Sequence, residues 1–186
     1  RSRALNLGIA QARGEYIATT DADMVFTPST FPRVLELLEK DHSSYFLLQC
    51  RDLPEGITHS DVLEGKIGWE DLESASTLRP RWGMGGLIAF PRNAYTDIRG
   101  LDERLQIYGG EDIDLAKRLN RLGLRRIWID EPSVRMYHIW HPSSLAAAES
   151  STEGTEAVRA NRSIHQNDLS TIRNTASWLG KPRGLE

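Results

Sequence analysis

Two aspartates separated by a single residue, Asp21 and Asp23, are the first side chains in the sequence that could perform chemistry. They end a β-prone stretch that begins at Glu15, and Met24–Phe26 continues its apolar character before Thr27-Pro28 breaks it, so we expect the two aspartates at the carboxyl end of a buried strand. In open α/β sheets, the carboxyl ends of the strands form the crevice where ligands bind. Two carboxylates that lie close together repel each other, and a hard cation such as Mg²⁺ or Mn²⁺ relieves the repulsion. The pattern predicts such a cation site or, in a simpler interpretation, a solvated turn.

A second acidic group, formed by Glu111, Asp112 and Asp114, directly follows the segment Tyr108–Gly110. Leucines spaced four and then three residues apart predict a helix that begins near Glu111 and ends at Gly123. Acidic residues in the first turn of a helix are favoured by its dipole, which explains them without any chemistry. The two glycines before them could also bring a carboxylate to the mouth of a pocket. A carboxylate fixed there can act as a general base toward a bound hydroxyl.

Glycines and a tryptophan precede the predicted strand Leu87–Pro91. Gly85 and Gly86 would let the backbone approach a ligand closely, or they serve a tight turn that needs a positive φ. Trp82 could offer its ring as a face for a sugar, or it could pack in the core.

Two histidines, His138 and His141, follow a further strand exit. A single histidine is usually a surface or hydrogen-bonded structural group. Two histidines beside aromatic residues, downstream of an acidic site, indicate that one of them is a metal ligand, since neutral imidazole can complete a Mn²⁺ shell. The sequence leaves open which of the two it is.

The elements that must position these residues alternate between helix and strand, the pattern of an α/β domain. Between the second and third strands lies a long polar excursion, residues 51–81, which we expect to be functional or mobile. Predicted strands lie at 16–20, 45–50, 87–91 and 125–130, and predicted helices end near Gly14, begin near Thr30 and Glu111, and pass through Ile164, Leu169 and Ile172.

Length and composition limit the classes of function. The 186 residues fit one domain, with 39% hydrophobic and 26% charged residues, as in ordinary globular proteins. A net charge of -3 argues against a general nucleic-acid binder. The single cysteine, Cys50, forms no intramolecular disulfide, which fits a reducing compartment. We expect a cytoplasmic location, with membrane association supplied by regions outside this sequence.

The order and spacing of these motifs resemble the GT-A glycosyltransferases. Within them, the chain looks most like family 2 and the related C-terminal domains of β-1,4-galactosyltransferases and chondroitin-type polymerases. The resemblance covers roughly Arg1 to Pro142. It implies an α/β fold with a GT-A mixed sheet flanked by helices in residues 1–142, followed by a loop and a helical extension in residues 143–186. The motifs that carry it are Asn6-Leu7-Gly8-Ile9, Ala12–Ile17, Asp21-Ala22-Asp23, Gly85-Gly86, Gly109–Leu115 and Tyr137-His138.

The resemblance implies an inverting, metal-dependent transfer of a sugar from a UDP-sugar to a hydroxyl of a glycan or glycoconjugate, in a setting such as polysaccharide biosynthesis. Asp23 would bind Mn²⁺ or Mg²⁺ directly, Asp21 would face the ribose or the metal, and His138 would complete the metal shell. Asp112 would take the proton of the acceptor hydroxyl. Glu111, a second catalytic residue, and Asp114 would bind or orient the acceptor. The other implied substrate-binding residues are Gly110, and Gly85, Gly86 and Trp82 at the sugar.

The chain departs from the family pattern on its N-terminal side, since it lacks the strands that hold the uracil and ribose. We therefore expect an N-terminally truncated GT-A domain. Tyr108 also stands where the galactosyltransferase-like pattern often has tryptophan, which leaves the acceptor open. Two other functions stay open: another Asp-x-Asp enzyme that transfers nucleotidyl or phosphoryl groups, and a non-catalytic carbohydrate-binding fragment.

Overall fold

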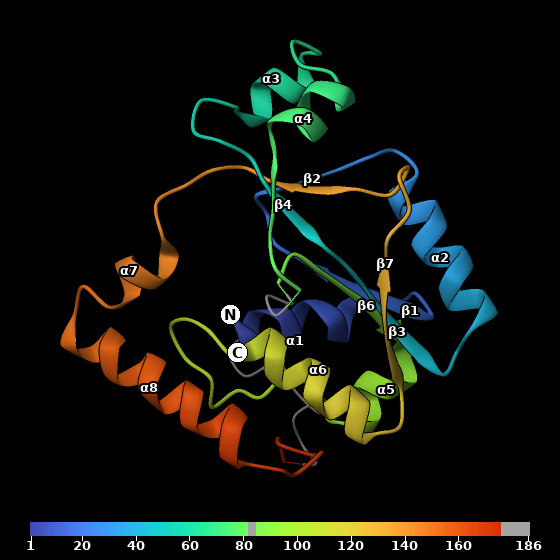
Figure 1. Cartoon of the computed structure of the whole chain (residues 1–186). Coiled ribbons are helices and arrows are strands. Elements are labelled where there is room, and N and C mark those ends of the chain that lie inside the picture. The colour runs from blue at the N-terminus through green and yellow to red at the C-terminus, as the bar shows by residue number, and fades with distance from the viewer. Residues whose placement is uncertain (82–84, 176–186) are drawn as a thin grey trace. The chain divides into compact units, whose positions relative to one another are not determined.

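A computed structural model describes residues 1–81 and 85–175, so the expectation for Trp82 lies outside the described residues. The chain divides into two compact units, each of which combines segments distant in sequence (Figure 1). Unit 1 consists of Arg1–Ile17, Phe90–Arg125 and Ser143–Glu186, and unit 2 consists of Ala18–Ala89 and Arg126–Pro142.

Unit 2 contains most of two four-stranded sheets. The first sheet has the strand order β1-β6-β3-β7. Strands β3 and β6 are antiparallel, with Phe46 opposite Ala89, and every residue in both strands is buried, as expected for continuous apolar runs. Helix α2 packs against β3. The bounds are β1 Tyr16–Thr20, β3 Ser44–Leu48, β6 Leu87–Pro91, β7 Arg125–Ile129 and α2 Thr30–Lys40.

The second sheet has the order β2-β8-β4-β5 and is mixed. Its strand β8 is antiparallel to β2 on one side and parallel to β4 on the other. The bounds are β2 Met24–Phe26, β4 Cys50–Asp52, β5 Thr77–Leu78 and β8 Met136–His138. The expected mixed α/β architecture is confirmed.

The run predicted as one strand from Tyr45 to Cys50 is in fact two strands, because the chain passes there from the first sheet to the second. Gln49 marks the break. Its side-chain amide donates to the carbonyl oxygen of Arg79 at 2.8 Å and its side-chain oxygen accepts from Arg81 at 3.0 Å. The chain makes the same passage between β1 and β2, so the Asp-x-Asp segment is the connection between two sheets.

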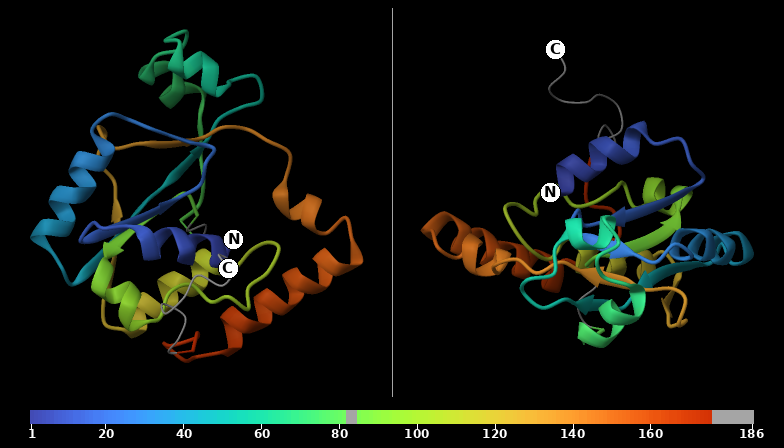
Figure 2. Two further views of the ribbon diagram at one scale, coloured as in Figure 1. Left: turned by 180° about the vertical axis from the view of Figure 1, so that it is seen from behind. Right: turned by 90° about the horizontal axis from the view of Figure 1, so that it is seen from above.

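The polar excursion folds into two short helices beside the second sheet, at the top of Figure 1 and again in the left view of Figure 2: α3 (His59–Leu63) and α4 (Trp69–Ala75). Leu53, Leu72 and Tyr137 form a small core under them. Trp69 stacks on Tyr137 with 6.4 Å between the ring centroids.

Unit 1 is largely helical. Its helix α6 begins after Gly110, which has φ +93°, and ends before Gly123, which has φ +105°, as the sequence predicted. Helix α1 is anchored by Asn6, whose side chain exchanges two hydrogen bonds with the backbone of Leu101 at 3.0 and 2.9 Å. The bounds are α1 Ser2–Gln11, α5 Arg92–Asp97, α6 Glu111–Arg121, α7 Ser144–Ala148 and α8 Thr152–Asn167.

Helix α8 lies beside α6 within unit 1 (Figure 1). The described residues after Pro142 therefore group with the helices of this unit. The helix predicted through Ile172 ends earlier, at Asn167. Among the described helices, none combines the length and apolar character needed to cross a bilayer.

Candidate functional site

Strand register in the second sheet brings Asp23 and His138 together. Met24 in β2 pairs with His138 in β8, and the amide of Ile139 donates to the carbonyl oxygen of Asp23 at 2.9 Å. His138 thus lies across from the carboxylate that ends the Asp-x-Asp segment. His141 lies three residues further along the chain, and its side chain also lies beside Asp23.

The three side chains form a compact cluster whose ligand atoms all lie within 4.8 Å of one another. Asp23 Oδ2 is 3.5 Å from His138 Nε2 and 3.1 Å from His141 Nε2. The two Nε2 atoms are 3.1 Å apart. The structure therefore brings both candidate histidines to Asp23, where the sequence left the choice open.

The other carboxylate oxygen of Asp23 supports the assignment of a cation site. Its Oδ1 is buried and has no hydrogen-bond partner among the described residues. A buried carboxylate oxygen without a donor is costly unless an ion or water completes it. One carboxylate and two imidazoles are donors that a divalent transition-metal ion such as Mn²⁺ accepts, so the residues present fit the metal.

Asp52 supports His138 from the opposite side, and sequence reasoning missed it. The parallel register of β4 and β8 pairs the two residues, and Asp52 Oδ1 lies 3.0 Å from His138 Nδ1. A proton held on Nδ1 by this carboxylate leaves the Nε2 lone pair facing Asp23 and available to a metal. No motif marks Asp52, and only the strand register could have found it.

Arg79 completes this support. Its Nε donates to Asp52 Oδ2 at 3.0 Å, and its Nη2 lies against Asp52 Oδ1. Burial acts to raise the pKa of Asp52, but the hydrogen bond and charge of Arg79, together with His138, outweigh it and hold that pKa below its usual range. Asp52 is therefore an anionic anchor for the imidazole.

Asp21 is not part of the cluster that the described residues form, and its expected role as a metal ligand stays a prediction. The chain turns at Ala22 and Asp23, and Asp21 still follows β1, with its amide 3.4 Å from the carbonyl oxygen of Gly86. Gly86 has φ +104°, and a Cβ there would lie 2.6 Å from the side chain of Met136. The positive φ favours glycine here, and any other residue would also require the methionine side chain to move. Gly85 is half-buried beside Gly86.

In unit 1, the acidic turn lies at the start of α6. The Glu111 carboxylate, 7% exposed, accepts a hydrogen bond from Arg1 Nη1 at 2.6 Å. The Asp112 carboxylate, 18% exposed, lies 3.7 Å from Arg1 Nη2. Asp112 is therefore the carboxylate of this pair that is more accessible to solvent.

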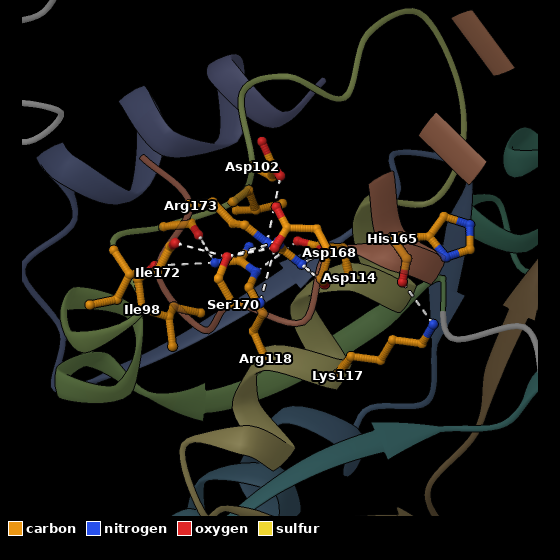
Figure 3. Close-up of polar contacts among 12 residues, drawn as sticks. Ile98, Asp102, Asp114, Lys117, Arg118, His165, Asp168, Ser170, Ile172 and Arg173 are labelled. Atoms are coloured by element: carbon orange, nitrogen blue, oxygen red, sulfur yellow. Dashed lines mark hydrogen bonds and ion pairs between the residues drawn. The ribbon is translucent and has the colours of Figure 1, made fainter. Parts of the chain in front are cut away.

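Asp114, also in the acidic turn, is buried. Its carboxylate is 1% exposed and is bound by two buried arginines, at 2.7 Å by Arg118 Nε and at 3.2 Å by Arg173 Nη2 (Figure 3). Helical spacing places it one turn from Arg118 on α6. These contacts account for the buried charge of Asp114, and its expected role at the acceptor stays a prediction.

Two family models match the chain. Residues 1–86 match glycosyl transferase family 2, and residues 74–142 match the N-terminal domain of galactosyltransferase. Together the matched ranges cover residues 1–142, which contain both acidic groups and both histidines. Among curated protein sequences, none matches this chain significantly.

A crystal structure of GalNAc-T7 with UDP, GalNAc and Mn²⁺ is similar to the chain, with a TM-score of 0.55 and 17% sequence identity. The similarity covers 76% of this chain and 30% of that one, so this chain spans less than a third of the length of its structural neighbour. At this identity the likeness establishes the fold, and it confirms the α/β architecture expected from the sequence.

Proposed function

We propose that this chain is a glycosyltransferase of the GT-A type, which transfers a sugar from a UDP-sugar to a hydroxyl group of a glycan or glycoconjugate; the two family-model matches and the similar fold support the proposal. The observation that carries the proposal is the cluster of Asp23, His138 and His141, with one carboxylate oxygen left without a donor among the described residues. The structural neighbour holds UDP, GalNAc and Mn²⁺, and we extend this type of ligand set to the chain as part of the proposal.

Asp23, His138 and His141 would hold the divalent ion. When bound, the ion neutralises charge on the departing diphosphate, so that this leaving group needs no proton. Two imidazole ligands favour Mn²⁺ over Mg²⁺, because Mg²⁺ prefers oxygen ligands. Asp52 fixes the His138 ring in the tautomer that this role requires.

Asp112 is the proposed general base. The acceptor oxygen bonds to the anomeric carbon while the bond from that carbon to the diphosphate breaks, and the diphosphate leaves with the electron pair. The hydroxyl proton moves to the Asp112 carboxylate. A single displacement of this kind inverts the anomeric configuration. Glu111, held by Arg1, would orient the turn that presents Asp112.

The remaining candidates complete the substrate side of the proposal. Asp21 would face the ribose of the donor, and Gly110 would allow close approach of the acceptor. Gly85, Gly86 and Trp82 would line the donor sugar.

Calorimetric titration of Mn²⁺ and UDP into the folded chain tests the proposal. We expect joint binding in the wild type and its loss in Asp23→Asn, which keeps the side-chain volume but removes the charge. Asp21→Asn is the matched control two residues away, and it should retain Mn²⁺ binding in the absence of UDP. Equal Mn²⁺ affinity in Asp23→Asn and the wild type would refute the metal centre.

A screen with UDP-GalNAc and other UDP-sugars then tests transfer, with the anomeric configuration of the product read by NMR. Asp112→Asn should abolish transfer while UDP and Mn²⁺ still bind. Turnover of a nucleoside triphosphate in place of a UDP-sugar would favour a nucleotidyl or phosphoryl transferase. Sugar binding without any metal affinity would favour a carbohydrate-binding module.

A further inference from the structure

The segment just before the acidic turn has an unusual backbone. Ile107 has φ +58°, a left-handed conformation that is unfavourable for a β-branched residue. Gly109 and Gly110 follow with φ +89° and +93°, where glycine carries no such cost. Ile107 must therefore be held in place by contacts from elsewhere in unit 1.

Asn161 of α8 supplies those contacts. Asn161 is 3% exposed. Its side-chain nitrogen donates to the carbonyl oxygens of Gln106 and Tyr108 at 2.7 and 2.9 Å, and its side-chain oxygen accepts from the amide of Gln106 at 3.1 Å. The bonded residues flank Ile107 on both sides. Only one orientation of the amide satisfies all three bonds, since the nitrogen must face both carbonyls. Asn161 thus satisfies backbone hydrogen-bonding groups of this segment, as a neighbouring strand does in a sheet.

One helical turn further along α8, His165 covers the other end of the same segment. A Cβ added to Gly110 would lie 2.7 Å from His165 Cδ2, so the helix approaches the glycine backbone closely. Lys117 of α6 donates to the carbonyl oxygen of His165 at 2.8 Å (Figure 3). Helix α8 therefore contacts the segment near Ile107, at Gly110 and through the first turns of α6.

The segment presents two large side chains to solvent. Ile107 is 50% exposed and Tyr108 is 38% exposed, although α8 covers the backbone beneath them. An exposed tyrosine ring offers an apolar face with a polar edge, which suits a sugar ring. Because Asp112 begins the adjoining helix, the conformation of this segment determines what lies next to the proposed base.

We propose that Asn161 is a positioning residue for acceptor binding, which holds the Gln106–Tyr108 backbone so that Tyr108 can receive the acceptor sugar. The inference rests on the proposed glycosyltransferase function and deepens it. It also assigns a role to helix α8, which lies beyond residue 142, where the family-model matches end.

The test compares Asn161→Ala with Asn167→Ala in the whole chain. Asn167 is on the same helix but exposed, and its amide donates only to Ser163 among the hydrogen bonds described for it. Hydrogen exchange of the Gln106 amide, measured by NMR, directly reports the hydrogen bond from this amide to Asn161. Saturation-transfer NMR with the methyl glycosides of galactose, glucose, GalNAc and GlcNAc reports acceptor binding without requiring catalysis.

We expect Asn161→Ala to increase hydrogen exchange at the Gln106 amide. We also expect it to weaken the affinity for the glycoside that binds the wild type by at least about tenfold, because the segment is no longer held by these hydrogen bonds in its binding conformation. The affinity for Mn²⁺ with UDP should be unchanged, and Asn167→Ala should match the wild type throughout. Tyr108→Ala, a surface change, should weaken glycoside binding without affecting exchange at Gln106 beyond the control.

Unchanged exchange at Gln106 in Asn161→Ala, unchanged glycoside binding, or no glycoside binding by the wild type would each overturn the proposal. These results are distinguishable from failure of the proposed function. That failure appears as absence of Mn²⁺ and UDP binding or of transfer, and the exchange and glycoside measurements require neither.

Discussion

Asp23 and Asp114 are both aspartates in acidic motifs, yet their surroundings differ in kind. Asp23 meets two imidazoles, is 33% exposed, and keeps one oxygen without a donor among the described residues. Asp114 meets two guanidiniums and is 1% exposed. An arginine carries a permanent charge and five donors, whereas a neutral histidine offers a lone pair.

The comparison separates a ligand site from a structural ion network. Around Asp114 the compensating charge is supplied by the chain itself, through Arg118 and Arg173. Around Asp23 the nearest partners are groups that can share a cation. The identity of the basic partner, more than the number of acidic residues, decides which role a carboxylate takes.

The largest effect should come from Arg118→Met. Arg118 is fully buried and donates to Asp114 and to the carbonyl oxygens of Ile98 and Gly100 at 3.2 and 2.6 Å. Its loss leaves buried acceptors without a donor, so we expect the free energy of unfolding to fall by about 3–5 kcal/mol. Urea denaturation followed by circular dichroism measures it.

Arg121→Met on the same helix is the matched control, because Arg121 is exposed. It should change the free energy of unfolding by less than about 0.5 kcal/mol. If the two variants lose equal stability, the network around Asp114 is not the structural element described above.

The next effect concerns the other cluster. Asp52→Asn keeps the shape of the side chain but removes the charge that holds the His138 proton on Nδ1. We expect Mn²⁺ affinity to fall by about 10–100-fold, as for other residues that orient a metal ligand. Calorimetry measures the affinity, and an unchanged value would mean that Asp52 does not orient the imidazole.

Acid should weaken the network of unit 1 through Asp102, which is fully buried and accepts hydrogen bonds from Arg104 at 2.7 to 3.2 Å. Burial acts to raise its pKa, but these hydrogen bonds and the charges of Arg104 and Arg118 hold that pKa below the ordinary 3.8. A depressed carboxyl pKa stabilises the fold above pH 3.8, and the contribution is lost as the pH falls below that value toward the folded pKa.

Urea midpoints measured from pH 6 to pH 3 check this expectation. The wild type should lose stability below about pH 4 more steeply than Asp102→Asn, which has no proton to bind at that position. Parallel curves for the two proteins would contradict it.

The smallest expected effect is on the reactivity of Cys50, which serves as a control for the Asp52→Asn variant. Cys50 is 2% exposed, and burial raises the pKa of its thiol to about 12. At pH 8 it should resist iodoacetamide in the native protein and react after unfolding. Mass spectrometry should show the same protection in Asp52→Asn, two residues away. Rapid labelling of that variant would mean that lost Mn²⁺ affinity reflects an opened sheet.

Much of the fold could be predicted from local signals. The apolar run at 87–91 and the helix between Gly110 and Gly123 are where periodicity and glycine placed them. The passage of the chain between the two sheets at Gln49 could not be predicted, because no local signal distinguishes one continuous strand from two strands in different sheets. The short helices of the polar excursion likewise depend on the core at Tyr137, far away in sequence.

The candidate site was predictable only in part, for the same reason. Asp23 and the histidines have motifs and residue types that indicate chemistry. Asp114 has the same residue type, but its two arginine partners could not be predicted from the sequence, because Arg173 is 59 residues away. Asp52, Arg79 and Asn161 have no motif, since their roles consist of backbone register and of contacts with distant segments.

The central place of β8 in the second sheet bears on how the protein comes into being. His138 and Asp52 are separated by 86 residues in sequence, and β2, the other strand that pairs with β8, is still further away in sequence. Closing such long loops costs entropy before any contact repays it, so the second sheet should be completed late in folding. During synthesis, the Asp-x-Asp segment leaves the ribosome long before its histidines do. The proposed cation site is therefore completed in one of the final steps, and a divalent ion that binds only the finished cluster would favour the native chain over every earlier intermediate.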